Sequence, residues 1–87
     1  MSGDELARFR TSINELDRTI LAAVNRRLAL VAELKRYKDE RELAFVDPER
    51  EALLLDDLVQ ANGGPLSDEG VRALFVELLA LTKRELR

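Results

Sequence analysis

The chain has 87 residues, of which 46% are hydrophobic and 36% are charged, and it contains no cysteine, histidine or tryptophan. This length allows one small domain, and we expect a single domain over residues 1–87. Without Cys and His, the sequence excludes thiol and imidazole nucleophiles, disulfides and the usual structural zinc sites. Fourteen basic and 17 acidic residues give a net charge of −3, which argues against nucleic acid as the main partner.

The N-terminal segment is polar and acidic, and no apolar stretch follows it. It reads Met1-Ser2-Gly3-Asp4-Glu5, and nowhere does the chain contain a run of about 18 apolar residues. We therefore expect a cytoplasmic protein with no membrane segment. Any catalysis must rely on carboxylates, Lys, Arg, hydroxyls or backbone groups.

Glycine and proline, which interrupt helices, divide the chain into three segments. In the first segment, from Asp4 to about Arg41, apolar residues recur every three or four positions, or after seven where Arg27 interrupts the pattern. They are Leu6, Phe9, Ile13, Leu16, Ile20, Val24, Val31 and Leu34. This spacing predicts one long helix.

The second segment begins with Asp47-Pro48-Glu49, which is typical of a helix N-terminus: an N-cap, a proline and an acid in the first turn. We expect this short helix to end at Asn62-Gly63 in a left-handed conformation. Ser67 is the expected N-cap of a third helix of medium length. The sequence therefore predicts an all-α fold with one long, one short and one medium helix.

The length of the first helix predicts an assembly. About 36 residues give a helix of roughly 54 Å, whereas a compact chain of this size has a radius of gyration of about 12 Å. The two shorter helices cannot cover its whole apolar face, so we expect a second copy to cover the rest in an intertwined homodimer. A coiled coil that carries no site satisfies the same geometry.

Two long cationic side chains, Arg27 and Lys38, lie in line with the apolar face of the first helix. Eleven residues separate them, roughly 16 Å along the helix, so the two side chains could close on a small ligand between them. The alternative is that each reaches solvent or pairs with a nearby carboxylate such as Glu33 or Glu42.

Arg10 precedes Arg27 by 17 residues, or about 25 Å of helix, so the two cannot bind one small molecule within one chain. In a dimer with antiparallel long helices, Arg10 of one subunit can reach the Arg27 and Lys38 region of the other. Arg50 and Glu51 add a cation and an acceptor in the first turn of the second helix. This set suits a small dianion better than hydrolysis by a nucleophile and a base.

These cationic and acidic residues, together with the sequence around each of them, resemble the all-helical (AroQ-type) chorismate mutases. The resemblance covers about nine tenths of the chain in the family's order and spacing. The matching stretches are Phe9-Arg10-Thr11-Ser12-Ile13-Asn14-Glu15-Leu16-Asp17, Ile20-Leu21, Arg26-Arg27-Leu28-Ala29-Leu30-Val31, Tyr37-Lys38, Val46-Asp47-Pro48-Glu49-Arg50-Glu51, Leu66-Ser67-Asp68-Glu69 and Leu74-Phe75. The resemblance implies a dimer of three-helix subunits that converts chorismate to prephenate in aromatic amino acid biosynthesis, without a cofactor or a metal.

The resemblance also implies how the cations act. Arg10 from the partner subunit and Arg27 would hold the two carboxylates of the substrate, with support from Arg50. Lys38 would donate to the ether oxygen whose bond breaks, where negative charge develops. The rate would then come from holding one reactive conformer and from preorganised positive charge.

The ring hydroxyl of the substrate is assigned, by the same resemblance, to Glu51 and to the backbone near Asp47. One departure from the family's pattern, at Leu86, is serious. The family usually has Ser at the position of Thr82 and Gln or Glu at the position of Leu86, and the second of these also donates to the ether oxygen.

Since Leu86 cannot donate, either Glu85 or the segment Thr82-Lys83-Arg84 substitutes, or the site is incomplete in the isolated protein. Small mutases of actinobacterial type look similar at this position. The resemblance to them implies an activating complex with DAHP synthase, the first enzyme of the shikimate pathway.

Two other functions stay open on the sequence alone. A sibling pericyclic enzyme, a 4-amino-4-deoxychorismate mutase or an isochorismate-pyruvate lyase, would share the carboxylate-binding arginines. A non-catalytic helical dimer that acts as a regulatory or docking module is favoured by Leu86. The polar site residues argue against that module: Arg10, Arg27, Lys38, Arg50 and Glu51.

Overall fold

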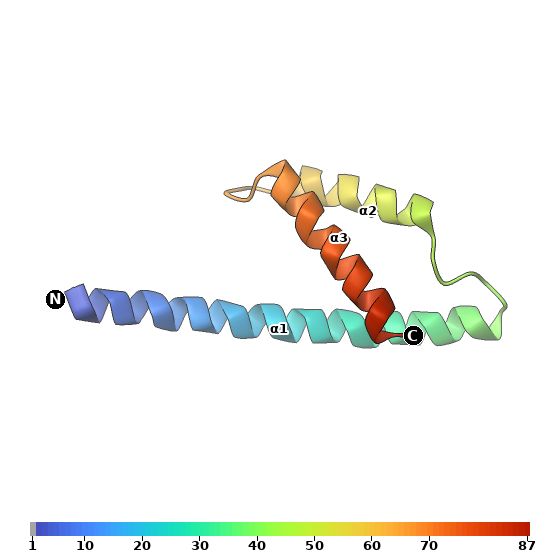
Figure 1. Cartoon of the computed structure of the whole chain (residues 1–87), viewed down its shortest axis with the longest axis horizontal. Coiled ribbons are helices and arrows are strands. Elements are labelled where there is room, and N and C mark those ends of the chain that lie inside the picture. Colours follow the sequence, from blue (N-terminus) through green and yellow to red (C-terminus); the bar gives the residue numbers. More distant parts are fainter. Residues whose placement is uncertain (1) are drawn as a thin grey trace. The chain divides into compact units, whose positions relative to one another are not determined.

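The computed structural model describes residues 2–87 and contains three α-helices (Figure 1). They are α1 (Ser2–Glu40), α2 (Pro48–Ala61) and α3 (Asp68–Glu85). Residues 2–87 contain no strand. The predicted all-α class, with a long, a short and a medium helix in that order, is therefore confirmed. No helix in this described part has both the length and the apolar character needed to cross a membrane.

Backbone contacts divide the chain after Glu33 into two compact units, each described by itself. The first unit consists of the N-terminal part of α1. The second unit, Leu34–Arg87, contains the last turns of α1, the helices α2 and α3, and their connections. The single domain over residues 1–87 stays a prediction.

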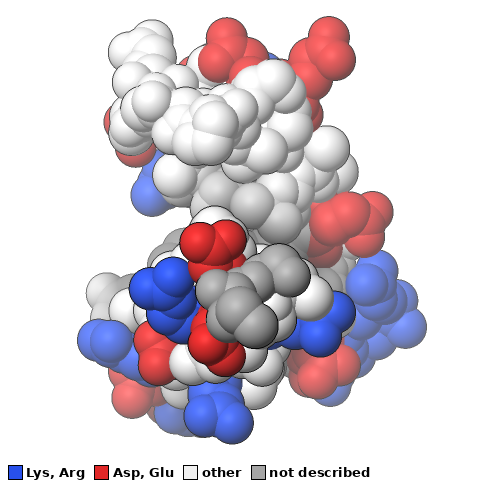
Figure 2. Space-filling view, turned by 90° about the vertical axis from the view of Figure 1, so that its left-hand side faces the viewer, with Lys and Arg blue, Asp and Glu red and all other residues white. Residues whose placement is uncertain are grey.

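The first unit exposes most of its large apolar side chains. Each of the following is between 49% and 68% exposed: Leu6, Phe9, Ile13, Leu16, Ile20, Leu21 and Leu30. Figure 2 looks onto the N-terminal end of α1, where acidic and basic side chains are intermingled over the helix surface. The charged side chains are solvated, and no other element of this unit packs against its apolar face.

In the second unit, α2 and α3 form a helical hairpin whose members pack against each other (Figure 1). Side chains cap both N-termini as predicted. Asp47 Oδ1 accepts the backbone N–H of Arg50 at 3.1 Å, and Ser67 Oγ accepts that of Gly70 at 3.0 Å. Each cap satisfies a backbone donor that the first turn of a helix leaves without a partner.

The end of α2 corrects one prediction. Asn62 ends the helix, but its φ of −71° and ψ of 123° are extended, and the positive φ of 74° belongs to Gly64. The Asn62 side chain explains the difference, because Nδ2 donates to Leu66 O at 2.6 Å and Oδ1 accepts from Gly64 N at 3.1 Å. The amide bridges the turn, so the left-handed residue is Gly64, beyond the predicted Asn62-Gly63 pair.

The hairpin has a small core of its own. Among the described residues, only Val71 (4% exposed) and Thr82 (6% exposed) are buried, and both lie on α3. An ion pair between Arg72 and Asp56, 2.9 Å long, also joins α3 to α2. The hairpin therefore combines apolar packing with a charged contact at its surface.

Candidate active site

The turn that follows α1 determines where Lys38 lies. Glu42 has a left-handed φ of 56°, and its N–H donates to Asp39 O at 3.2 Å, while Leu43 N–H donates to Lys38 O at 2.8 Å. These two bonds form a Schellman motif with Glu where Gly is usual. The turn brings the Phe45 carbonyl to the Lys38 side chain, whose Nζ donates to it at 3.3 Å. The ammonium group is therefore anchored to the connection between α1 and α2.

The first turn of α2 positions three predicted site residues together. Asp47 accepts from Arg50 N through its side chain, and its own carbonyl accepts from Glu51 N at 3.0 Å. Asp47 thus fixes the turn from which Arg50 and Glu51 extend. Arg50 is exposed, whereas the Glu51 side chain is only 24% exposed.

Thr82 and Leu86 lie one helical turn apart at the C-terminus of α3. The Thr82 hydroxyl donates to Leu78 O at 2.7 Å within the helix. Leu86 is the C-cap, and its backbone N–H donates to Thr82 O at 3.1 Å. The helix thus holds position 86 in place, but the Leu86 side chain supplies no hydrogen-bond donor.

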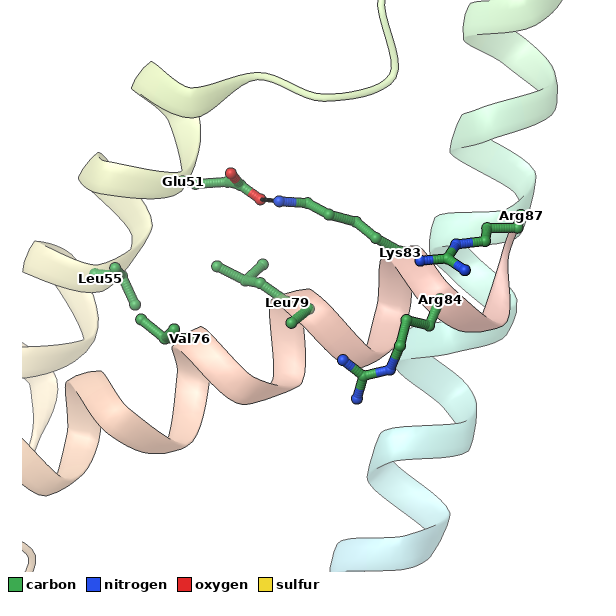
Figure 3. A pocket seen from close by; sticks show the side chains of 8 residues that line it. Glu51, Leu55, Val76, Leu79, Lys83, Arg84 and Arg87 are labelled. Carbon is green, nitrogen blue, oxygen red and sulfur yellow. Dashed lines mark ion pairs between the residues drawn. The ribbon is translucent and has the colours of Figure 1, made fainter.

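Lys83, which the sequence indicated only as part of a segment, contacts a predicted site residue directly. Its Nζ lies 2.7 Å from Glu51 Oε1, and the ion pair spans the space between α2 and α3 (Figure 3). The sequence signal was the antiparallel order of a helical hairpin, which brings the start of α2 near the end of α3. The acidic residue Glu51 at the start of α2 and the basic residue Lys83 near the end of α3 were therefore candidates for an ion pair.

The remaining predicted residues, Arg10 and Arg27, lie in the first unit. Arg10 is exposed and Arg27 is half-buried. Arg27 borders an open hollow on α1 whose lining is Ala23, Arg26, Arg27, Ala29, Leu30 and Glu33. That Arg10, Arg27 and Lys38 act on one ligand stays a prediction.

The side chains of the second unit favour anion and hydroxyl binding. Lys38, Arg50 and Lys83 are cations, and Glu51 is a half-buried acceptor. Charge-assisted hydrogen bonds from such groups are strong where water is partly excluded. In residues 2–87, no three acidic side chains lie close enough together to hold a metal ion. The fold and this site define a three-helix protein with a cation-rich site.

Comparison with known families identifies this class further. The model of the family described as chorismate mutase type II matches residues 9–86. Because the match covers most of the chain, the chain belongs to the chorismate mutase type II family. The family resemblance seen in the sequence is confirmed.

Two curated relatives are bacterial proteins named bifunctional chorismate mutase/prephenate dehydratase. The chain is 34% identical to the one from Stutzerimonas stutzeri and 33% identical to the one from Pseudomonas aeruginosa, over 82 residues in each case. Each alignment covers 88% of this chain but 22% of the relative. The chain therefore spans about a fifth of the length of these relatives.

Two solved structures share the fold over nearly their whole length. Form I of the chorismate mutase from Thermus thermophilus is 33% identical, with a TM-score of 0.88 and coverage of 90% of this chain and 98% of that one. Form II is 32% identical, with a TM-score of 0.89 and coverage of 92% and 91%. The three-helix architecture is thus that of the family.

Proposed function

We propose that this chain forms one chorismate mutase domain and converts chorismate to prephenate. The observation that carries the proposal is the family match over residues 9–86, a range that includes every polar residue predicted for the site. The reaction breaks one carbon–oxygen bond and forms one carbon–carbon bond within a single molecule. It needs no nucleophile and no general base, which suits a chain without Cys and His.

In this proposal, cations provide the electrostatic stabilisation. Arg27 and Arg10 of the partner subunit bind the two carboxylates and hold the substrate in a reactive conformer, with support from Arg50. Lys38 donates to the ether oxygen as negative charge develops there. The hydrogen bond from Lys38 Nζ to Phe45 O supports this role, because it restricts an otherwise flexible ammonium group.

The ring hydroxyl is received by Glu51 together with the backbone near Asp47. Both belong to the capped first turn of α2, where the Asp47 carbonyl accepts from Glu51 N at 3.0 Å. A capped helical turn is a rigid support, so Glu51 can select one orientation of the ring substituent.

The direct test follows the loss of chorismate by absorbance, with the product identified by mass. 4-Amino-4-deoxychorismate and isochorismate are assayed in parallel. Lys38→Ala and Arg27→Ala should each lower kcat/KM by about a hundredfold or more. Arg36→Ala is the matched control, since Arg36 is an exposed cation on the same helix. Prephenate formation that survives Lys38→Ala, or no prephenate from the wild type, contradicts the proposal.

A homodimer is part of the same proposal. The exposed apolar face of the first unit supports it, because a second copy would remove that face from water. We expect inactive Arg10→Ala and Arg27→Ala proteins to regain activity when mixed, since each heterodimer then contains one intact shared site. If no activity returns although labelled subunits exchange, Arg10 does not complete the site of another subunit.

The proposal also covers Leu86 and an activating partner, DAHP synthase. With Lys38 as the only side-chain donor to the ether oxygen, the missing donor costs about 3 to 4 kcal/mol of transition-state stabilisation. Leu86→Gln should raise kcat/KM, since α3 is helical up to that position. Added DAHP synthase should raise the activity of the wild type more than that of Leu86→Gln. If the wild type is highly active, and neither Leu86→Gln nor added DAHP synthase alters that activity, another group already supplies the donor.

A further inference from the structure

The ion pair between Glu51 and Lys83 is a feature that the proposed mechanism does not use. Glu51 comes from the first turn of α2 and Lys83 from the last turns of α3, and their charged atoms lie 2.7 Å apart (Figure 3). The function proposed above makes Glu51 the acceptor for the ring substituent of the substrate. A cation this close changes which substituents Glu51 can accept.

The surroundings of this ion pair reduce the screening of its two charges by water. The pair borders an open pocket of about 460 Å³ with an apolar lining that includes Leu55, Val76 and Leu79. The side chains of Glu51 and Lys83 are 24% and 41% exposed. In the other ion pair between α2 and α3, Asp56 and Arg72 are 60% and 47% exposed. Because charges interact more strongly where less water screens them, the Glu51 pair is the stronger electrostatic element.

The whole pocket is biased toward positive charge. Besides Lys83, two further cations, Arg84 and Arg87, line it, and Glu51 is the one acidic side chain among the described residues of the lining. An isolated carboxylate would attract a cationic substituent such as a ring ammonium more strongly than a neutral hydroxyl. Beside Lys83, this attraction is offset by repulsion between two ammonium groups.

We propose that Lys83 is a specificity-determining residue that makes the Glu51 site select a ring hydroxyl over a ring ammonium. Lys83 occupies one carboxylate oxygen, Oε1, and leaves the other as an acceptor for a neutral donor. It also places a repulsive charge against a cationic substituent, which is how a site rejects a close analogue. The inference rests on the proposed function, because it needs Glu51 to receive the ring substituent.

The experiment compares chorismate with 4-amino-4-deoxychorismate at a pH below the pKa of the analogue's amine. For each compound, kcat/KM is measured by absorbance and binding by calorimetry. Lys83→Met removes the charge, Lys83→Gln keeps a neutral donor, and Lys83→Arg keeps the charge. Arg72→Met is the matched control, because it breaks the other ion pair between α2 and α3.

The selectivity for chorismate over the amino analogue should fall by about tenfold or more in Lys83→Met and in Lys83→Gln. Lys83→Arg and Arg72→Met should stay within about threefold of the wild type. A folded dimer of either neutral variant with unchanged selectivity overturns the inference, and so does an equal change in Arg72→Met. If the wild type neither binds nor converts either compound, the proposed function itself fails, and that result appears before any variant is made.

Discussion

Among the described residues, the two units of this chain differ in that only the second contains a buried apolar side chain. In the first unit, apolar residues at helical spacing, such as Phe9 and Leu16, are 68% and 62% exposed. In the second unit, Val71 is 4% exposed, and α2 and α3 pack against each other. Both units are helical, so helix propensity does not separate them. Both units leave large apolar side chains exposed, among them Leu53 (64%) and Leu74 (55%) of the hairpin, but the hairpin also buries part of its apolar surface within itself.

The comparison indicates which residues of the proposed site are held in place by bonds. Lys38, Asp47 and Glu51 are held by bonds within the second unit. Arg10 and Arg27 lie on a helix segment whose apolar face is exposed. Bonds within the second unit thus organise this part of the proposed site.

The largest expected effect comes from a charge on the exposed apolar face. Leu16→Asp in a lone chain would cost little, because Leu16 is 62% exposed. In a dimer it would bury two unpaired carboxylates, and association should weaken by about a hundredfold or more. Sedimentation over a concentration series measures this. Thr11→Asp, about 140° away around α1, is the control and should leave the dimer intact. A Leu16→Asp dimer as tight as the wild type would mean that this face is not an interface.

The next effect concerns the core of the hairpin. Val71→Ala should lower the free energy of unfolding by about 2 kcal/mol, because it removes two buried methyl groups and leaves a cavity. Val76→Ala on the same helix is the matched control and should cost about half as much or less, since Val76 is 49% exposed. Urea unfolding measures both. Equal losses would show that the buried core at Val71 does not stabilise the hairpin as the structure indicates.

The two side-chain caps should each contribute about 1 kcal/mol to the hairpin. Asp47→Ala and Ser67→Ala both remove an acceptor from a first-turn N–H, at distances of 3.1 and 3.0 Å. Asp47→Asn and Ser67→Asp retain an acceptor and should stay within about 0.5 kcal/mol of the wild type. Thermal unfolding, followed by circular dichroism, distinguishes these variants. Loss of stability in the acceptor-retaining variants would argue against capping as the cause.

The smallest expected effect is a gain. Glu42 has a left-handed φ of 56°, so Glu42→Gly should raise the free energy of unfolding by about 0.5 to 1 kcal/mol. Glu40→Gly, two residues earlier and still in α1, should lower it by about 1 kcal/mol. Opposite signs from two Glu→Gly changes this close in sequence would confirm the Schellman turn. The same sign for both would contradict it.

Helix ends were predictable where a residue type acts locally. Asp47, Pro48 and Ser67 start helices through bonds to their own neighbours, so the starts of α2 and α3 were predicted correctly. The turn after α1 was not predicted in detail, because Glu rather than Gly takes the left-handed position at Glu42. The left-handed residue after α2 was misplaced, since a side-chain amide controls that turn.

The candidate site was predictable in composition but only partly in geometry. The family spacing indicated Lys38 and Glu51, and the structure shows what holds each of them. The partner of Glu51, Lys83, depends on how α2 and α3 meet, and no local pattern encodes that contact. In the proposed dimer, the meeting of Arg10 with Arg27 would depend on a second chain, which a single sequence and a single subunit do not contain.

The continuity of α1 has a consequence for how such chains can vary in length. Arg10 and Arg27 lie on one uninterrupted helix. One residue inserted between them would turn everything before it by about 100° and shift it by about 1.5 Å. Phe9 and Arg10 would then point in a new direction relative to Arg27 and the following turns. Insertions and deletions should therefore accumulate in the loop between α2 and α3, at residues 63–66, and spare α1.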